Sequence, residues 1–169
     1  DVSLTEALAK TAAALKQIGW DDEAAQVQAE IMVAAETCGN NQGLVKMFKP
    51  QLMAPASGAE APVLERETSN SAIVNGRQAP GMLALVKAVD TAIGKAKGGV
   101  ASVGVYNTST SSGQLAFYGA RAARAGMVCI ITANSPEFVA ARAGAKATFG
   151  TNPLMFACPV AGAEPFVFD

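Results

Sequence analysis

Apolar residues follow helical spacing through the first forty residues. Ser3 begins a capping box and Gly19 supplies a C-terminal stop, so this interval is predicted to be a helix. Its apolar positions share one helical face: Leu4, Leu8, Ala12, Leu15 and Ile18. A second helix is expected next, capped by either Asp21 or Asp22, and ending before the Gly- and Asn-rich break at residues 38–43.

The middle of the chain alternates between predicted helices and strands. A short helix is expected over 44–52, and the Pro- and Gly-containing stretch after it is typical of an exposed loop. Residues 62–77 contain two β-prone runs with turn residues, which predict two short strands. Residues 80–97 have amphipathic spacing between a proline and a Gly-Gly stop, which predicts a long helix.

A strand, a helix and a strand are expected in succession over 100–106, 113–124 and 127–132. This order suggests an α/β layer. The predicted fold class is therefore α/β, with N-terminal helices followed by a mixed sheet flanked by helices. We expect one incomplete domain over 1–169, with an N-terminal helical segment (1–55) and an α/β core segment (62–169).

The last third breaks this rhythm. Residues 133–149 are expected to be loop-like with one possible helical turn, followed by a turn at 150–153. Apolar runs at 154–158 and 165–169 predict two strands joined by a hairpin-like return, and there the sequence stops. Domains rarely end on an apolar strand, because its edge is left exposed. We therefore expect residues outside this chain to complete the fold.

Composition narrows the class of protein. Half of the residues (50%) are hydrophobic and only 16% are charged, with 13 basic and 14 acidic side chains and a net charge of -1. These values exclude a disordered chain and a nucleic-acid binder driven by bulk charge. This fraction of charged residues is too low to solvate the whole surface of the protein well. We therefore expect another polypeptide to cover part of that surface. No apolar run is long enough to predict a membrane span.

Histidine is absent. A Ser/His/Asp triad and a His-based zinc site within this chain are therefore excluded. The three cysteines are too few for an all-cysteine zinc site and lack the spacing of a disulfide framework, so no metal site is predicted. Their use favours a reducing, intracellular compartment, either the cytoplasm or an organelle lumen.

Several motifs together resemble one enzyme family. They are GTNPLMFACPVAGAEPFVFD (150–169), ITANSPEF (131–138), the turn NGRQAPG before a long helix, and a two-helix opening followed by a glycine-flanked loop. This combination is similar to the malate/L-lactate dehydrogenase type 2 family, which includes ureidoglycolate, sulfolactate and 2,3-diketogulonate oxidoreductases and cyclic imino-acid reductases. The missing dinucleotide fingerprint agrees with that family's non-Rossmann fold.

The resemblance implies a cofactor and partners. Family members use NADH or NADPH, usually act as homodimers, and are about twice as long as this chain, with much of the nicotinamide site in their C-terminal half. The chain thus resembles an N-terminal half, either a cleavage product or one member of a split pair. A complementary C-terminal chain and a homodimer or larger assembly are the implied partners.

The resemblance implies that two family histidines and one family arginine are replaced in this chain. Gln42 takes the place of the first histidine, and Lys46 takes the place of the arginine, which resembles a carboxylate anchor. Ser111 stands at the presumed acid/base histidine, with Thr110 possible because the spacing is uncertain by one residue. Ser111 and Lys46 are therefore the candidate catalytic residues. The candidate cofactor-binding residues implied by the resemblance are Gln42, Gly150, Thr151, Asn152, Pro153 and Asp169.

Each of these residues also has a purely structural interpretation. Lys46 suits a solvated surface, Ser111 a helix-capping loop, Gln42 a turn, Gly150–Pro153 a tight turn, and Asp169 a chain end.

Three functions remain open. The first is an NAD(P)H-dependent reductase of 2-oxo or cyclic imino acids, with Lys, Tyr or water as proton donor or with a substrate that is already protonated. The second is a catalytically silent structural or assembly subunit. The third is cofactor binding alone, for sensing. A serine hydroxyl does not replace an acid poised near neutral pH, so ordinary histidine-based activity is expected to be lost.

Overall fold

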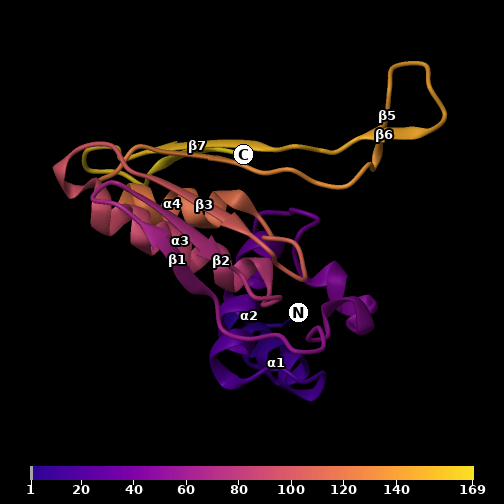
Figure 1. Cartoon of the computed structure of the whole chain (residues 1–169). Helices are drawn as coiled ribbons and strands as arrows, with labels where there is room; N and C mark the ends of the chain where they lie inside the picture. Colours follow the sequence, from indigo (N-terminus) through magenta and orange to yellow (C-terminus); the bar gives the residue numbers. More distant parts are fainter. Residues whose placement is uncertain (1) are drawn as a thin grey trace. The chain divides into compact units, whose positions relative to one another are not determined.

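The computed structural model describes residues 2–169 (Figure 1). The chain is mixed α/β and divides into two compact units, the first ending at Tyr118 and the second spanning Gly119–Asp169. The predicted division into an N-terminal helical segment (1–55) and an α/β core segment (62–169) stays a prediction. The first unit contains α1 (Leu4–Gln17), α2 (Asp22–Thr37), η1 (Leu44–Phe48), η2 (Pro50–Met53), β1 (Val63–Glu67), β2 (Ser71–Asn75), α3 (Gly81–Lys95), η3 (Ala96–Gly98) and β3 (Ser102–Tyr106).

The two N-terminal helices form as their caps predict. The Ser3 side chain accepts a hydrogen bond from the Glu6 backbone N–H, and Asp21, rather than Asp22, does the same for Ala24 at the start of α2. α1 and α2 lie side by side and share an apolar core (Figure 1). This core consists of Ala12, Leu15, Trp20, Ala24, Ala25 and Ala29. Trp20 also donates from Nε1 to the Met53 carbonyl at 2.6 Å, which ties the core to η2.

The segment 44–52 differs from its prediction as one short helix. It forms two 3-10 turns, η1 and η2, which meet at Lys49 and Pro50. Pro50 has no backbone N–H to continue a helical ladder, and its fixed φ suits the first turn of a new helix. The second turn therefore starts where an unbroken helix cannot continue.

The sheet of the first unit has the order β1-β2-β3. β1 pairs with β2 antiparallel, β2 pairs with β3 parallel, and α3 makes the crossover between the parallel pair. Val74 of β2 and Ala84 and Ala88 of α3 form the buried contact between helix and sheet. Parallel β2 and β3 end at the same edge, so the chain leaves both strands close to one another.

α4 (Leu115–Arg124) crosses the boundary between the units. The second unit contains one sheet of order β4-β7-β8 and a two-stranded β5-β6 pair. The strands are β4 (Cys129–Thr132), β5 (Val139–Ala140), β6 (Ala147–Phe149), β7 (Leu154–Cys158) and β8 (Phe166–Phe168). β7 and β8 pair antiparallel, which confirms the predicted hairpin-like return.

Two expectations for this half were wrong. Residues 133–149 contain the β5-β6 pair instead of a loop with a helical turn. These strands are two and three residues long, too short to show a period in the sequence. β3 and β4 also belong to different sheets, so α4 is not a crossover within one layer.

Among the described residues, none of the helices combines the length and apolarity needed to cross a bilayer.

Candidate functional site

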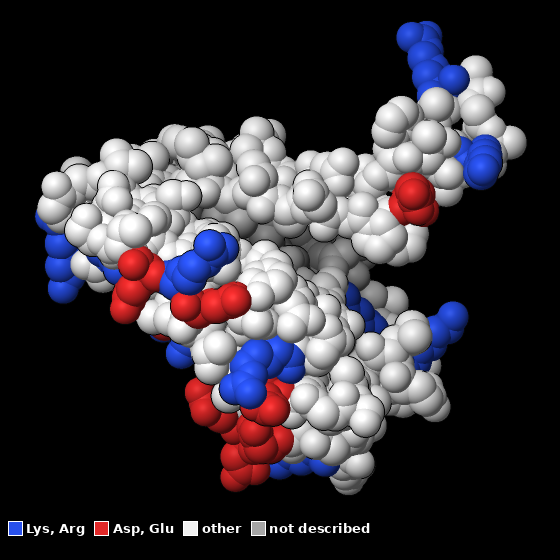
Figure 2. Space-filling view, viewed as in Figure 1, with Lys and Arg blue, Asp and Glu red and all other residues white. Residues whose placement is uncertain are grey.

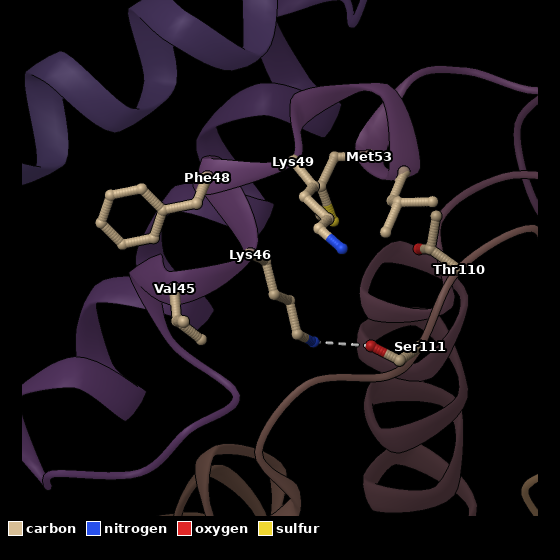
Figure 3. Close-up of a pocket in the computed structure, with 8 residues that line it drawn as sticks. Val45, Lys46, Phe48, Lys49, Met53, Thr110 and Ser111 are labelled. Atoms are coloured by element: carbon tan, nitrogen blue, oxygen red, sulfur yellow. Dashed lines mark hydrogen bonds between the residues drawn. The ribbon is translucent and has the colours of Figure 1, made fainter. Parts of the chain in front are cut away.

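The two candidate catalytic residues meet in the first unit. Lys46 Nζ donates a hydrogen bond to Ser111 Oγ at 2.6 Å, although 65 positions separate them in the chain (Figure 3). Thr110, the alternative to Ser111, instead accepts from the Gly81 backbone N–H at 3.3 Å. Ser111 is therefore the hydroxyl that faces the lysine.

Lys46 is held by the packing of η1 against α2. Gly43 caps η1 so closely that a Cβ there would lie 2.8 Å from the Glu36 nitrogen and 3.0 Å from the Met32 carbonyl. The next residue, Leu44, donates its N–H to Glu36 Oε2 at 3.0 Å. The glycine and the carboxylate together fix the turn that carries Lys46.

Ser111 lies in the loop between β3 and α4, which is fixed from two sides. A Cβ on Gly81 of α3 would lie 2.5 Å from the Thr110 carbonyl oxygen and 2.8 Å from the Ser111 carbonyl carbon. From the other side, the buried Tyr118 hydroxyl donates to the Ser112 carbonyl. Backbone contact with α3 and the tyrosine anchor together position the serine.

The Lys46–Ser111 pair borders a cavity of about 470 Å³. Lys46 crosses this space toward Ser111, and Lys49 points into the same space (Figure 3). The remaining lining is Val45, Phe48, Leu52, Met53 and Thr110. The sequence did not predict this apolar wall. The feature in the sequence that corresponds to it is the density of large apolar residues around two lysines in 45–53, and this pattern also fits an ordinary amphipathic helix.

Partial burial changes the chemistry of Lys46. Removal from water disfavours its charged form and lowers the pKa of the ammonium below the ordinary value of 10.5. A lysine with a lowered pKa is a better proton donor near neutral pH than an exposed lysine. The pair can therefore attract an anionic group and pass a proton through the Ser111 hydroxyl.

Neither tyrosine is suited to replace the missing acid. Tyr106 donates its hydroxyl to Glu65 Oε2 at 2.6 Å, and this hydrogen bond is the main reason that its pKa is raised. Burial raises the pKa of Tyr118. Both phenols therefore hold their protons more tightly than a free tyrosine does.

The candidate cofactor residues are divided between the two units. Gln42 belongs to the turn before η1, where its N–H donates to Asn40 Oδ1 at 2.9 Å and its side chain donates to Asn41. Gly150–Pro153 connects β6 to β7 in the second unit, and Asp169 follows β8.

The Gly150–Pro153 turn does not form a dinucleotide cradle on its own. Thr151 donates its N–H to Ser135 Oγ at 2.8 Å, and Asn152 Oδ1 accepts from the Ser135 N–H at 3.2 Å. A Cβ on Gly150 would meet Ser135 and lie 2.5 Å from Asn152 Oδ1. The space that the glycine leaves open is filled by Ser135 and Asn152. A bound NAD(P) would need contacts from other residues.

Comparison with known proteins gives a consistent picture. The model of the malate/L-lactate dehydrogenase family matches residues 2–169. The ureidoglycolate dehydrogenase (NAD(+)) of Escherichia coli O157:H7 is 33% identical over 92% of this chain and 46% of its own. The (2R)-3-sulfolactate dehydrogenase (NADP(+)) of Chromohalobacter salexigens is 32% identical over 99% of this chain and 51% of its own.

Solved structures agree. The malate dehydrogenase of Pyrococcus horikoshii matches with a TM-score of 0.89 and 26% identity, over 99% of this chain and 49% of that one. The malate dehydrogenase of Entamoeba histolytica matches with a TM-score of 0.85 and 29% identity, over 100% and 48%. The chain spans about half the length of the relatives that it matches.

Proposed function

Since the chain belongs to the malate/L-lactate dehydrogenase family, we propose that it is the substrate-binding and proton-donating part of an NAD(P)-dependent reductase of 2-oxo or cyclic imino acids. One observation carries this proposal: Lys46 and Ser111 are in hydrogen-bond contact beside a cavity. Relatives named for NAD(+) and for NADP(+) support the cofactor class without deciding between the two.

In this mechanism the chain supplies the proton. Reduction of a 2-oxo acid needs a hydride at carbon, which a nicotinamide supplies when bound, and a proton at oxygen. The Ser111 hydroxyl gives its proton to the carbonyl oxygen, and the Lys46 ammonium gives one to Ser111, leaving a neutral amine that solvent reprotonates. Lys49 remains to attract the substrate carboxylate as a point charge.

We assign the dinucleotide to a complementary C-terminal chain, within a homodimer or larger assembly. Two observations support this assignment. Two polar groups of the Gly150–Pro153 turn, the Thr151 N–H and Asn152 Oδ1, are hydrogen-bonded to Ser135. Relatives also carry as much chain again as the part matched here.

A catalytically silent structural subunit is the second candidate. The absence of histidine favours it, because the side chain best suited to move protons near neutral pH is missing.

The test uses the native particle, whose intact mass first shows which polypeptides accompany the chain. NADH and NADPH oxidation is followed with a panel of 2-oxo and cyclic imino acids. Ser111→Ala and Lys46→Met are each expected to lower kcat by about 10²-fold. Lys87→Met, which changes an exposed lysine of α3, should leave kcat unchanged.

A thermal shift distinguishes the two candidates. Cofactor at 100 times its dissociation constant should stabilise a reductase by about 2.7 kcal/mol. A particle that shows neither turnover nor this stabilisation is a silent subunit, and the reductase proposal then fails.

A further inference from the structure

The β4-β7-β8 sheet presents two unlike faces. Its inner face packs against α4, where a Cβ on Gly119 would lie 3.0 Å from the Ala157 Cβ and would also meet the buried Met155. Side chains alternate along strands, so the neighbours of Met155 and Ala157 on β7 point the other way. Together with apolar residues paired to them on β4 and β8, they form what we call the outer sheet face: Ile130, Leu154, Phe156, Cys158, Phe166 and Phe168.

Strand register joins these side chains into one surface. Ile130 pairs with Phe156, and Phe156 pairs with Phe168, so the three cross the sheet in one row. The rings of Phe156 and Phe166 have centroids 6.3 Å apart. Large apolar side chains remain uncovered here, with 65% of Ile130, 55% of Leu154 and 61% of Phe168 exposed. Contiguous exposed apolar groups of this kind mark interaction sites.

No charged residue occurs in β4, β7 or β8. In the view of Figure 2 the surface over β7 is white, and charged side chains appear on the β5-β6 hairpin instead. A partner that binds this face must therefore present apolar side chains, because these strands contain no charged side chain that could form an ion pair with it.

We propose that the outer sheet face is the docking surface for the complementary C-terminal chain, a polypeptide equivalent to the second half of the family's longer members. This inference rests on the proposed function, which introduces that chain. Solved relatives match this chain over 99% and 100% of its length, strands β4, β7 and β8 included, and carry about as much polypeptide again. That additional polypeptide is the partner that we assign to the outer sheet face.

The native cysteines report on the docking. Cys158 lies on the outer sheet face, whereas Cys38 is exposed in the first unit. The full chain is titrated with the second half of the Pyrococcus horikoshii malate dehydrogenase, and alkylation of each thiol is followed by mass spectrometry. We expect Cys158 alkylation to slow by about tenfold at saturation while Cys38 alkylation is unchanged.

Lysine substitutions test the surface directly. Ile130→Lys and Phe168→Lys should each weaken binding by at least about tenfold, because a charge is then buried in the contact. Val100→Lys changes an apolar residue of the first unit that is even more exposed, at 86%, and this variant should bind as the unchanged chain does. If a variant misfolds, protection of Cys158 in the unchanged chain still tests whether the second half binds the outer sheet face.

Three results would overturn the proposal: an unprotected Cys158, tight binding by both face variants, or protection of Cys158 in the chain alone that grows with its concentration. The last would identify a second copy as the occupant. Neither readout needs cofactor or turnover. Docking without activity therefore rejects the reductase alone, and activity without Cys158 protection rejects the docking surface alone.

Discussion

Lys46 is the residue on which the proposed proton transfer depends. Its ammonium keeps a hydrogen bond to Ser111, but the apolar surroundings disfavour its charge and lower its pKa. The folded chain therefore binds fewer protons at this site than the unfolded chain does, between the lowered pKa and 10.5. Stability contributed by this site consequently rises with pH in that window, and the full penalty applies below it.

We predict that Lys46→Met changes the pH dependence of stability. The melting temperature of the variant minus that of the unchanged chain should fall as pH rises from neutral toward 10.5, because only the unchanged chain recovers stability. Differential scanning calorimetry over this range measures the difference. Lys87→Met serves as the control for loss of an exposed lysine, and its difference should stay level. A level difference for Lys46→Met as well would remove the argument from burial.

At this scale the sequence identified Lys46 and Ser111 only through their positions in family motifs. Motif spacing left Thr110 and Ser111 undecided, since a one-residue offset cannot be resolved without the loop geometry. In the structure Ser111 is the one of the two that contacts Lys46. The apolar wall around Phe48 and Leu52 was not predictable, because the same residues suit the buried face of a helix.

At the scale of elements, glycine contacts hold the site in place. Gly81 lets α3 approach the backbone of Thr110 and Ser111, and an added methyl would lie 2.5 Å from the Thr110 carbonyl oxygen. We predict that Gly81→Ala destabilises the chain by about 1–3 kcal/mol, because backbone cannot yield as a flexible side chain does. Urea denaturation measures the change.

Gly94→Ala is the matched control within the same helix. Nothing lies within 4 Å of a Cβ at Gly94, so the substitution should stabilise by up to about 1 kcal/mol through helix propensity alone. Equal effects at the two positions would mean that contact with the Ser111 loop does not constrain α3.

Elements with strong local signals were predicted well. The cap at Ser3, the start of α2 at Asp21 or Asp22, and the long apolar period of α3 are local features that the sequence displays directly. β5 and β6 pair through Val139 and Phe149, ten positions apart, and neither strand is long enough to show a period. The assignment of β3 and β4 to separate sheets depends on long-range pairing, which periodicity does not encode.

At the scale of the whole molecule, low charge and apolar exposure favour association. The chain carries a net charge of -1 and 16% charged residues, and its outer sheet face contributes none of them. Association through such a surface is driven by removing apolar groups from water. Charge steering, in contrast, produces binding that weakens steeply with salt.

We therefore predict that docking of the second half has a negative heat-capacity change and little salt dependence. Burial of apolar surface gives the first signature, and the absence of charges in β4, β7 and β8 gives the second. Isothermal titration calorimetry at several temperatures, repeated at low and high sodium chloride, measures both. Phe168→Lys should reduce the heat-capacity change, while Val100→Lys should not. A binding constant that falls steeply with salt, or a heat-capacity change near zero, would place the contact on a charged surface elsewhere in the chain.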